Sequence, residues 1–294
     1  MYRRRTDLAL EAHELLTRRG QSLPGVSKEA RTVEGCTVTE VEIRGTEACR
    51  ALEKPEGTYV TLELLPMQQR EEGALERCAG AIGAELRRLM GEGVNSVLVA
   101  GLGNDAMTPD AIGPAALRHV LVTRHLSGEA GFSSLAAVSA LSPGVLGRTG
   151  LEAAELLRGA VRAVRPDAVI AVDALASRSL SRLCSTVQLT DAGLVPGSGV
   201  GNRRSAIDRS SLGVPVIAVG VPTVVDAATM ALDILEEAGL DAFDPSALRG
   251  RGTEVFVTPR DIDAQIRELS RMVGYGIDLA LHPLDFATLS ALLG

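Results

Sequence analysis

Residues 168–173 read Ala-Val-Ile-Ala-Val-Asp, a run of five apolar residues that ends in an aspartate. Such a run is typical of a strand that is buried on both faces in a parallel sheet. A second apolar run, Ser96–Ala100, is followed by a loop that reaches Asp110. Reactive groups in open α/β sheets gather at the carboxyl ends of the strands, so this placement predicts that Asp110 and Asp173 converge in an acid–base site.

The segments around these two runs alternate between strand and helix patterns. Between residues 96 and 172 the order is strand, helix, strand, helix, strand, which indicates a parallel sheet covered by helices. Gln21–Arg31 carries Gly, Pro and Ser and is predicted to be a loop. The runs Thr37–Ile43 and Thr58–Leu64 are predicted to pair beside the main sheet. The other predicted elements are helices at Asp7–Arg19, Glu71–Met90, Pro114–His125, Thr149–Val164, Val224–Gly239 and Thr258–Leu281, and strands at Leu135–Leu141, Thr186–Thr190 and Val214–Val219.

Composition narrows the class of protein. The chain has 294 residues, of which 46% are hydrophobic and only 2% aromatic, so Val, Leu, Ile and Ala must fill one main α/β core. A net charge of −7 argues against a nucleic-acid-binding surface. The sequence shows neither a signal peptide nor an apolar run long enough for a membrane span. Four widely spaced cysteines indicate reduced thiols in a cytoplasmic protein: Cys36, Cys49, Cys78 and Cys184.

The two aspartates are predicted to differ in protonation. Asp110 precedes the helix expected from Pro114, and the positive end of a helix dipole favours an ionised carboxylate. Asp173 follows five apolar residues, and loss of solvation favours its protonated form. Such a pair can serve as base and acid when water attacks an amide, although the sequence leaves the roles of the two residues open. Alternatively, both aspartates have purely structural roles: Asp110 caps a helix, and backbone N–H groups donate hydrogen bonds to the Asp173 carboxyl group.

Five longer motifs point to a known family. They are Gly-Leu-Gly-Asn-x-x-x-Thr-Pro-Asp-Ala-x-Gly-Pro at 101–114, Val-Asp-Ala-Leu-Ala-Ser-Arg at 172–178, Thr-Asp-Ala-Gly-Leu-Val-Pro-Gly-Ser-Gly-Val-Gly-Asn-Arg-Arg at 190–204, Gly-Val-Pro-Thr-Val-Val-Asp-Ala at 220–227 and Phe-Val-Thr-Pro at 256–259. Together they resemble the spore germination protease family, from about Arg5 to the C-terminus. Matches of this length are far more specific than an isolated Gly-rich pattern.

The resemblance implies an atypical aspartic endopeptidase that begins the degradation of small acid-soluble spore proteins in the spore core during germination. It implies a fold similar to that of hydrogenase maturation endopeptidases, a three-layer α/β/α sandwich with a mainly parallel sheet, here with a small β-hairpin extension. The family's two essential aspartates fall on Asp110 and Asp173. The family is made as a self-processing zymogen and assembles as a tetramer, so we expect a homotetramer without a nucleic-acid or membrane partner.

The family's cleavage preference places a processing bond near the N-terminus. The family cuts after an acidic residue that follows Thr or Ser and precedes a bulky apolar residue and Ala. Thr6-Asp7-Leu8-Ala9 fits, so the resemblance predicts cleavage between Asp7 and Leu8. The chain would then consist of a propeptide, residues 1–7, and a single peptidase domain, residues 8–294. Thr39-Glu40-Val41 and Thr253-Glu254-Val255 match in part but fall in predicted strands.

Further residues are candidates for the substrate side of the site. Arg203 and Arg204 follow the Gly-rich loop 197–202 and would attract an acidic residue, or else they are a solvated loop end. Asp226 either lines the cleft or caps the next helix, and Asn104 belongs to the loop before Asp110. The Gly-rich loop lacks the lysine of a phosphate-binding loop, so we interpret it as a substrate-side loop.

One departure from the family pattern lies at Asp105-Ala106, where bulkier or amide residues are expected. Asp105 would raise the pKa of Asp110 if it pointed inward, and would be a solvated surface residue otherwise.

Two other functions stay open at this stage. A metal-dependent hydrogenase-maturation-type endopeptidase would need a metal site, but none of the four dispersed histidines accompanies the aspartates at ligand spacing, so we expect no metal and no cofactor. A non-catalytic protein would bind the small spore proteins without cutting them.

Overall fold

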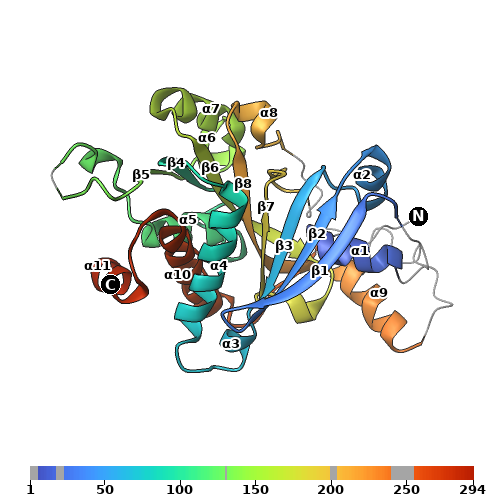
Figure 1. Cartoon of the computed structure of the whole chain (residues 1–294). Coiled ribbons are helices and arrows are strands. Elements are labelled where there is room, and N and C mark those ends of the chain that lie inside the picture. The colour runs from blue at the N-terminus through green and yellow to red at the C-terminus, as the bar shows by residue number, and fades with distance from the viewer. Residues whose placement is uncertain (1–5, 18–22, 130, 199–203, 240–254) are drawn as a thin grey trace.

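The computed structural model describes residues 6–17, 23–129, 131–198, 204–239 and 255–294. In this part of the chain, nine strands form one sheet with the order β1-β2-β3-β7-β8-β6-β4-β5, and β9 pairs with β8 (Figure 1). The strands are β1 Val26–Val33, β2 Cys36–Ile43, β3 Gly57–Glu63, β4 Ser96–Gly101, β5 Ala137–Leu141, β6 Ala168–Ser177, β7 Thr186–Thr190, β8 Val216–Asp226 and β9 Phe256–Val257.

The sheet has a parallel half and an antiparallel half. Strands β5, β4, β6 and β8 run parallel, as the apolar runs predict. From β8 onward the sheet continues through antiparallel pairs into β7, β3, β2 and β1. The predicted pairing of the runs at Thr37–Ile43 and Thr58–Leu64 is confirmed by β2 and β3. The antiparallel extension is therefore present and is larger than the small hairpin that the sequence predicts.

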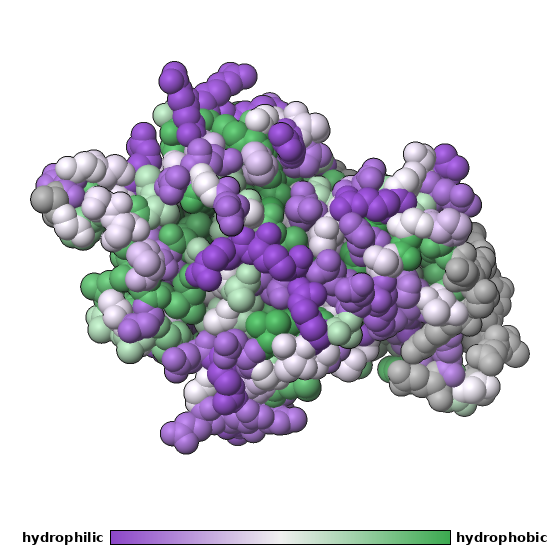
Figure 2. Space-filling model, in the orientation of Figure 1, coloured by the Kyte–Doolittle hydropathy of each residue, from purple (hydrophilic) through white to green (hydrophobic). Residues whose placement is uncertain are grey.

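The prediction of a loop at Gln21–Arg31 is wrong from Val26 onward, because β1 begins there and pairs with β2. Val33 of β1 pairs with Cys36 of β2, so Glu34 and Gly35 between them form a two-residue turn. Glu34 and Gly35 have positive φ angles of 50° and 80°. Such a turn suits a tight hairpin. Strand β1 lies at the sheet edge, and Figure 2 shows a largely hydrophilic surface over β1 and β2. An exposed edge strand lacks the apolar pattern by which strands are predicted.

Helices cover both faces of the sheet and make three layers (Figure 1). One face is covered by α4 (Ala74–Met90), α5 (Ile112–Ala116) and α10 (Ile262–Leu281). The other is covered in two parts, by α7 (Ala153–Val164) and α8 (Arg209–Leu212) over the parallel half, and by α1 (Ala9–Thr17) and α2 (Thr46–Leu52) over the antiparallel half. The shorter or peripheral helices are α3 Leu65–Gln68, α6 Leu146–Thr149, α9 Ala227–Glu237 and α11 Phe286–Leu293.

The predicted three-layer α/β/α class is thus confirmed. None of the described helices has the length and apolar content that a membrane span requires.

The alternation of side chains along β6 decides which face Asp173 occupies. Ile170 and Val172 pack in the core beneath α4 and α10, whereas Val169 and Ala171 pack in the core beneath α7. Successive side chains of a strand point to opposite faces, so Asp173 points to the same face as Val169 and Ala171. On that face the helical layer is divided between α7 and α1, which leaves room for a cleft above the middle of the sheet.

Two predicted boundaries near the aspartates are wrong. Strand β6 does not end before Asp173 but continues to Ser177. Its neighbour β4 ends at Gly101, opposite Val172, so Asp173 is the first residue of β6 beyond the end of β4. Helix α5 begins at Ile112, with Pro114 as its third residue. A proline is tolerated there because the first turn of a helix needs no N–H partner.

Other boundaries shift by a few residues. The helix predicted to reach His125 ends as α5 at Ala116 and is followed by short 3₁₀ turns. Residues 224–226 belong to β8 instead of a helix, and α10 starts at Ile262 instead of near Thr258.

The contact between α5 and the strand ends generates a prediction. A Cβ atom on Gly113 would lie 2.3 Å from the Leu102 carbonyl oxygen and 2.5 Å from that of Val172, so Gly113→Ala must push α5 away from the sheet. We expect Gly113→Ala to lower the free energy of unfolding by about 1–3 kcal/mol in urea titrations. Gly159→Ala is the matched control, since Gly159 lies inside α7 with no heavy atom within 4 Å, and it should be neutral or stabilising by about 1 kcal/mol. Equal stability of the two variants would contradict the close packing of α5.

Candidate active site

A cleft of about 2030 Å³ lies on the divided face of the sheet. Its walls come from α1 and the end of α2 on one side and from α6, the start of α7 and residues 193–198, 204–206 and 208 on the other. Its lining includes both predicted catalytic residues and the predicted processing residue, together with two residues discussed below: Asp7, Asp110, Asp173, Gln188 and Ser198. The structure therefore brings Asp110 and Asp173 into one cavity, although 63 positions separate them in the sequence.

Asp173 is a nearly buried carboxyl group, with 6% of its surface exposed. Its Oδ1 accepts a hydrogen bond of 2.9 Å from the Ala174 N–H. Burial raises the pKa of Asp173 well above its usual range, and the negative charges of Asp110 and Asp7 raise it further, while the Ala174 hydrogen bond acts in the opposite direction. The prediction that desolvation favours the protonated form of Asp173 is confirmed in direction.

Asp110 is the last residue of a 3₁₀ turn, Thr108–Asp110, and its loop is folded tightly around it. Its Oδ2 accepts a 2.8 Å hydrogen bond from the Asn104 N–H. Gly103 has a φ of 106°, and a Cβ atom there would lie 2.0 Å from the Asp110 carbonyl oxygen, so only glycine fits. The hydroxyl of Thr223 on β8 donates to the Pro109 carbonyl oxygen at 2.6 Å and ties the loop to the sheet.

Burial raises the pKa of Asp110 as well, against the hydrogen bond from Asn104. This differs from the expectation that a helix dipole would favour its ionised form. Helix α5 has only five residues and a weak dipole, so desolvation decides the direction. Asp173 is the more buried of the two residues, and the charge of Asp110 raises its pKa further. Burial and charge repulsion therefore favour the protonated form more strongly at Asp173 than at Asp110.

Asp7, before the predicted processing bond, lines the same cleft, whereas Leu8 and Ala9 after it are fully buried. The Asp7 N–H donates to the Ala176 carbonyl oxygen at 2.8 Å. The Asp7 carboxylate accepts the Ala176 N–H at 2.9 Å and the Ser198 hydroxyl at 2.7 Å. The Asp7 carbonyl oxygen accepts the Gln188 Nε2 at 3.2 Å, and the Ala9 N–H donates to Gln188 Oε1 at 2.7 Å. These bonds hold Asp7 and Ala9 to β6, β7 and Ser198, and the charge of Asp7 acts on Asp173.

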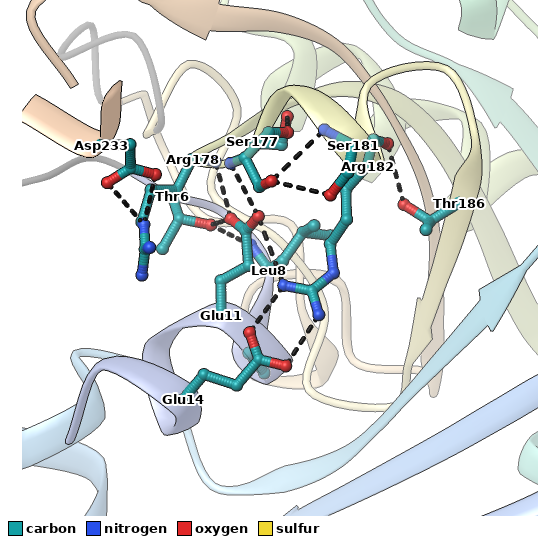
Figure 3. Close-up of polar contacts among 12 residues, drawn as sticks. Thr6, Leu8, Glu11, Glu14, Ser177, Arg178, Ser181, Arg182, Thr186 and Asp233 are labelled. Atoms are coloured by element: carbon teal, nitrogen blue, oxygen red, sulfur yellow. Dashed lines mark hydrogen bonds and ion pairs between the residues drawn. The ribbon is translucent and has the colours of Figure 1, made fainter. Parts of the chain in front are cut away.

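A network of acidic and basic side chains anchors α1 behind this segment (Figure 3). The Glu11 carboxylate accepts the N–H groups of Arg178 at 2.7 Å and Ser179 at 3.0 Å. The Arg182 guanidinium contacts Glu11 at 3.5 Å and donates to both oxygens of Glu14. Glu11 has 1% of its surface exposed, so these contacts are shielded from solvent and fix α1 to the loop after β6.

The other candidate residues have different positions. Asn104 places its side chain within its own loop, where Oδ1 accepts the Ala106 N–H at 3.1 Å. Asp226 is buried and caps α9 by accepting the N–H and hydroxyl of Thr229. Arg204 lines the cleft and approaches Glu152 at 3.9 Å. Arg203 lies outside the described residues.

Asp105 is exposed and forms an ion pair with Arg148 at the surface. It does not contribute to the raised pKa of Asp110, which matches its interpretation as a solvated residue.

Sequence reasoning missed three residues of the site. Gln188 lies inside the apolar strand β7, and its only signal is a polar residue between Val187 and Leu189. Ser198 lies in the Gly-rich loop that the sequence predicts on the substrate side. Thr223 gives no signal of its contact with the Asp110 loop. In the described part of the chain, no group of three or more His, Cys, Asp or Glu side chains is arranged to hold a metal ion.

One structural comparison gives only a weak match. The [NiFe] hydrogenase maturation protease HycI from Thermococcus kodakarensis KOD1 superposes with a TM-score of 0.34 and 14% identity, covering 66% of this chain and 98% of that one. A score this low supports no conclusion about this chain.

Sequence comparisons give much stronger matches. The family model described as Germination protease matches residues 6–239. The germination protease of Caldanaerobacter subterraneus subsp. tengcongensis is 42% identical over 309 aligned residues, which cover 95% of this chain and 94% of that protein. That of Clostridium perfringens strain SM101 is 39% identical, covering 96% of each chain, and that of Bacillus cereus strain AH187 is 43% identical over 80% of this chain and 66% of the other. The chain therefore belongs to the germination protease family.

Proposed function

We propose that the protein is an atypical aspartic endopeptidase in which Asp110 and Asp173 act together on a peptide bond. The observation that carries this proposal is the location of both carboxyl groups in one cleft, where the charge of one raises the pKa of the other. Two carboxyl groups that share one proton provide a base and an acid at the same pH. The cleft, of about 2030 Å³, has room for an extended peptide.

The difference in burial supports one assignment of the acid and base roles. Asp110, the more exposed residue, is the ionised general base that removes a proton from the attacking water. Asp173, whose pKa is raised well above its usual range, carries the proton and donates it toward the oxygen of the scissile carbonyl. When the tetrahedral intermediate collapses, the proton taken up by Asp110 passes to the leaving amine. The carbonyl re-forms and returns its proton to Asp173.

The proposed substrate class rests on the family resemblance. We propose that the substrates are small acid-soluble spore proteins, cut after Glu or Asp and before an apolar residue during germination, by a cytoplasmic homotetramer in the forespore or spore core. Membership of the germination protease family supports the spore-germination role. The contacts that the Asp7 carboxylate makes in the cleft support the preference for an acidic residue.

We propose further that the protein is a zymogen whose residues 1–7 are a propeptide and whose residues 8–294 form a single peptidase domain. The hydrogen bond between the Asp7 carbonyl oxygen and Gln188, and the charge that Asp7 exerts on Asp173, support self-processing at the Asp7–Leu8 bond. While Asp7 stays there, the segment occupies the place that another peptide would need.

The proposed pair is tested by single substitutions that remove one acid or base. We expect Asp110→Asn and Asp173→Asn each to lower kcat about 10²- to 10⁴-fold on a peptide containing Glu before an apolar residue, since an amide can replace neither group. Asp105→Asn is the control in the same loop, because Asp105 is exposed and paired with Arg148, and it should be near normal. Thermal unfolding verifies that all three fold. Near-normal turnover by either Asp110→Asn or Asp173→Asn would rule out the proposed catalytic pair. A wild-type protein that binds the peptide without cutting it would instead be a non-catalytic binding protein.

Self-processing is tested by mass spectrometry of the purified chain before and after mild acidification. Since the pKa of Asp173 is raised, lowering the pH increases the fraction of molecules that hold the required proton, so we expect loss of residues 1–7 and a new N-terminus at Leu8. Asp173→Asn should keep residues 1–7 under the same conditions. A fully active wild-type protein that retains Met1–Asp7 would reject the propeptide.

A further inference from the structure

The end of β4 leaves one side of β6 without a strand partner. Strand β4 stops at Gly101, opposite Val172, whereas β6 continues to Ser177 and, among the described strands, pairs there only with β8. Asp7 takes this open side: its N–H donates to the Ala176 carbonyl oxygen, and its side chain accepts the Ala176 N–H. Addition of an extended segment to an exposed strand edge is a common mode of peptide recognition. The chain's own N-terminal segment therefore occupies this strand edge at Asp7, through one main-chain and one side-chain hydrogen bond.

The registers of the central strands place Gln188 beside this segment. Gln188 pairs with Gly220, and Gly220 pairs with Asp173, so the Gln188 and Asp173 side chains point to the same face two strands apart, about 10 Å. The Gln188 amide is fixed at both ends, by Ala9 N–H on its oxygen and by the Asp7 carbonyl oxygen on its nitrogen. The main chain on both sides of the Asp7–Leu8 bond is thus held by one buried side chain. This is the arrangement of a bound peptide bond and not of a loosely packed end.

The Asp7 side chain is held by two neutral donors. Oδ2 accepts the Ala176 N–H and Oδ1 accepts the Ser198 hydroxyl, so both oxygens of the carboxylate have a partner. A side-chain amide at the same position would turn its NH₂ group toward one of the donors and lose that hydrogen bond. The two donors therefore distinguish a carboxylate from the amide of the same shape.

We propose that the Ala176 N–H and the Ser198 hydroxyl form the subsite that selects the acidic residue before the scissile bond, with Ser198 as its specificity-determining residue. This inference rests on the proposed endopeptidase function and deepens it, because it assigns the acid preference to two groups of the chain. The carboxylate held there also raises the pKa of Asp173, so an acidic substrate residue helps to keep the proton on the catalytic acid.

The anchoring of α1 keeps this subsite compatible with later substrates. Glu11 and Glu14 lie on the retained side of the Asp7–Leu8 bond and stay bound to the 178–182 segment after cleavage (Figure 3). The bonds to Ala176 and Ser198 belong to Asp7, on the departing side. Cleavage therefore vacates the acid subsite without releasing α1.

A double-mutant cycle on the full chain tests the proposal through the rate of self-processing. We expect Asp7→Asn and Ser198→Ala each to slow the appearance of the Leu8 N-terminus about 10- to 100-fold, the effect of losing a hydrogen bond to a charged group. The double variant should be no slower than the slower single variant, because both changes remove the same interaction. Ser198→Thr keeps the hydroxyl and should restore most of the rate. Ser210→Ala removes a serine bond to another carboxylate, that of Asp208, and should process normally.

A second measurement uses two added peptides that differ only in Glu or Gln before the cut bond. Wild-type protein should prefer Glu, and Ser198→Ala should reduce the ratio of kcat/KM for Glu over Gln about 10- to 100-fold, mainly by slowing the Glu peptide. A loss that is equal for both peptides, or fully additive effects in the cycle, would overturn the subsite while leaving the peptidase intact. If the wild-type protein cuts Glu and Gln peptides equally, the subsite is likewise rejected. If it cuts neither peptide and does not process itself, the proposed function fails and the subsite with it.

Discussion

The unequal length of β4 and β6 is the constraint on which the site depends. Because β4 ends at Gly101, the chain leaves the sheet there and folds back as the loop that carries Asp110. Because β6 continues, Asp173 lies just beyond the shared ladder, next to that loop. Gly101 and Gly113 let α5 approach the strand ends more closely than any side chain would allow. The backbone geometry thus brings two carboxyl groups that are distant in the sequence into one cleft.

Burial of these carboxyl groups has an electrostatic consequence. A buried carboxylate without a partner is costly, and the site reduces that cost by a raised pKa at Asp173, which favours its neutral form, and by the hydrogen bond from the Asn104 N–H to Asp110. The large polar network beside it, around Glu11 and Arg182, uses ion pairs and backbone N–H groups instead. One region of the molecule therefore contains two kinds of buried carboxyl group. Those at the cleft have raised pKa values, whereas Glu11 behind it is bound by a guanidinium and by backbone N–H groups.

The sequence predicts the parts of this structure whose signal is local. The apolar runs of β4 and β6 and the loop between them are enough to select Asp110 and Asp173, and long motifs are enough to indicate the family. Strand β1 escapes prediction because an exposed edge has no apolar pattern. The start of α5 is predicted two residues too late, because Pro114 is acceptable in the first turn of a helix but resembles a helix breaker further inside one. Gln188 also escapes prediction, since its role depends on the registers of β6, β7 and β8, which only tertiary structure sets.

The covalent link between Asp7 and α1 strengthens the binding of the Asp7 segment in the cleft. A tethered segment meets its binding site at an effective concentration in the millimolar range for a short linker, so even weak contacts keep it in place. In the proposed processing, cutting this link would dilute the released segment into bulk solution, from which it returns only at its free concentration. The same few hydrogen bonds would then no longer compete with a protein substrate, and opening of the cleft would be effectively one-way.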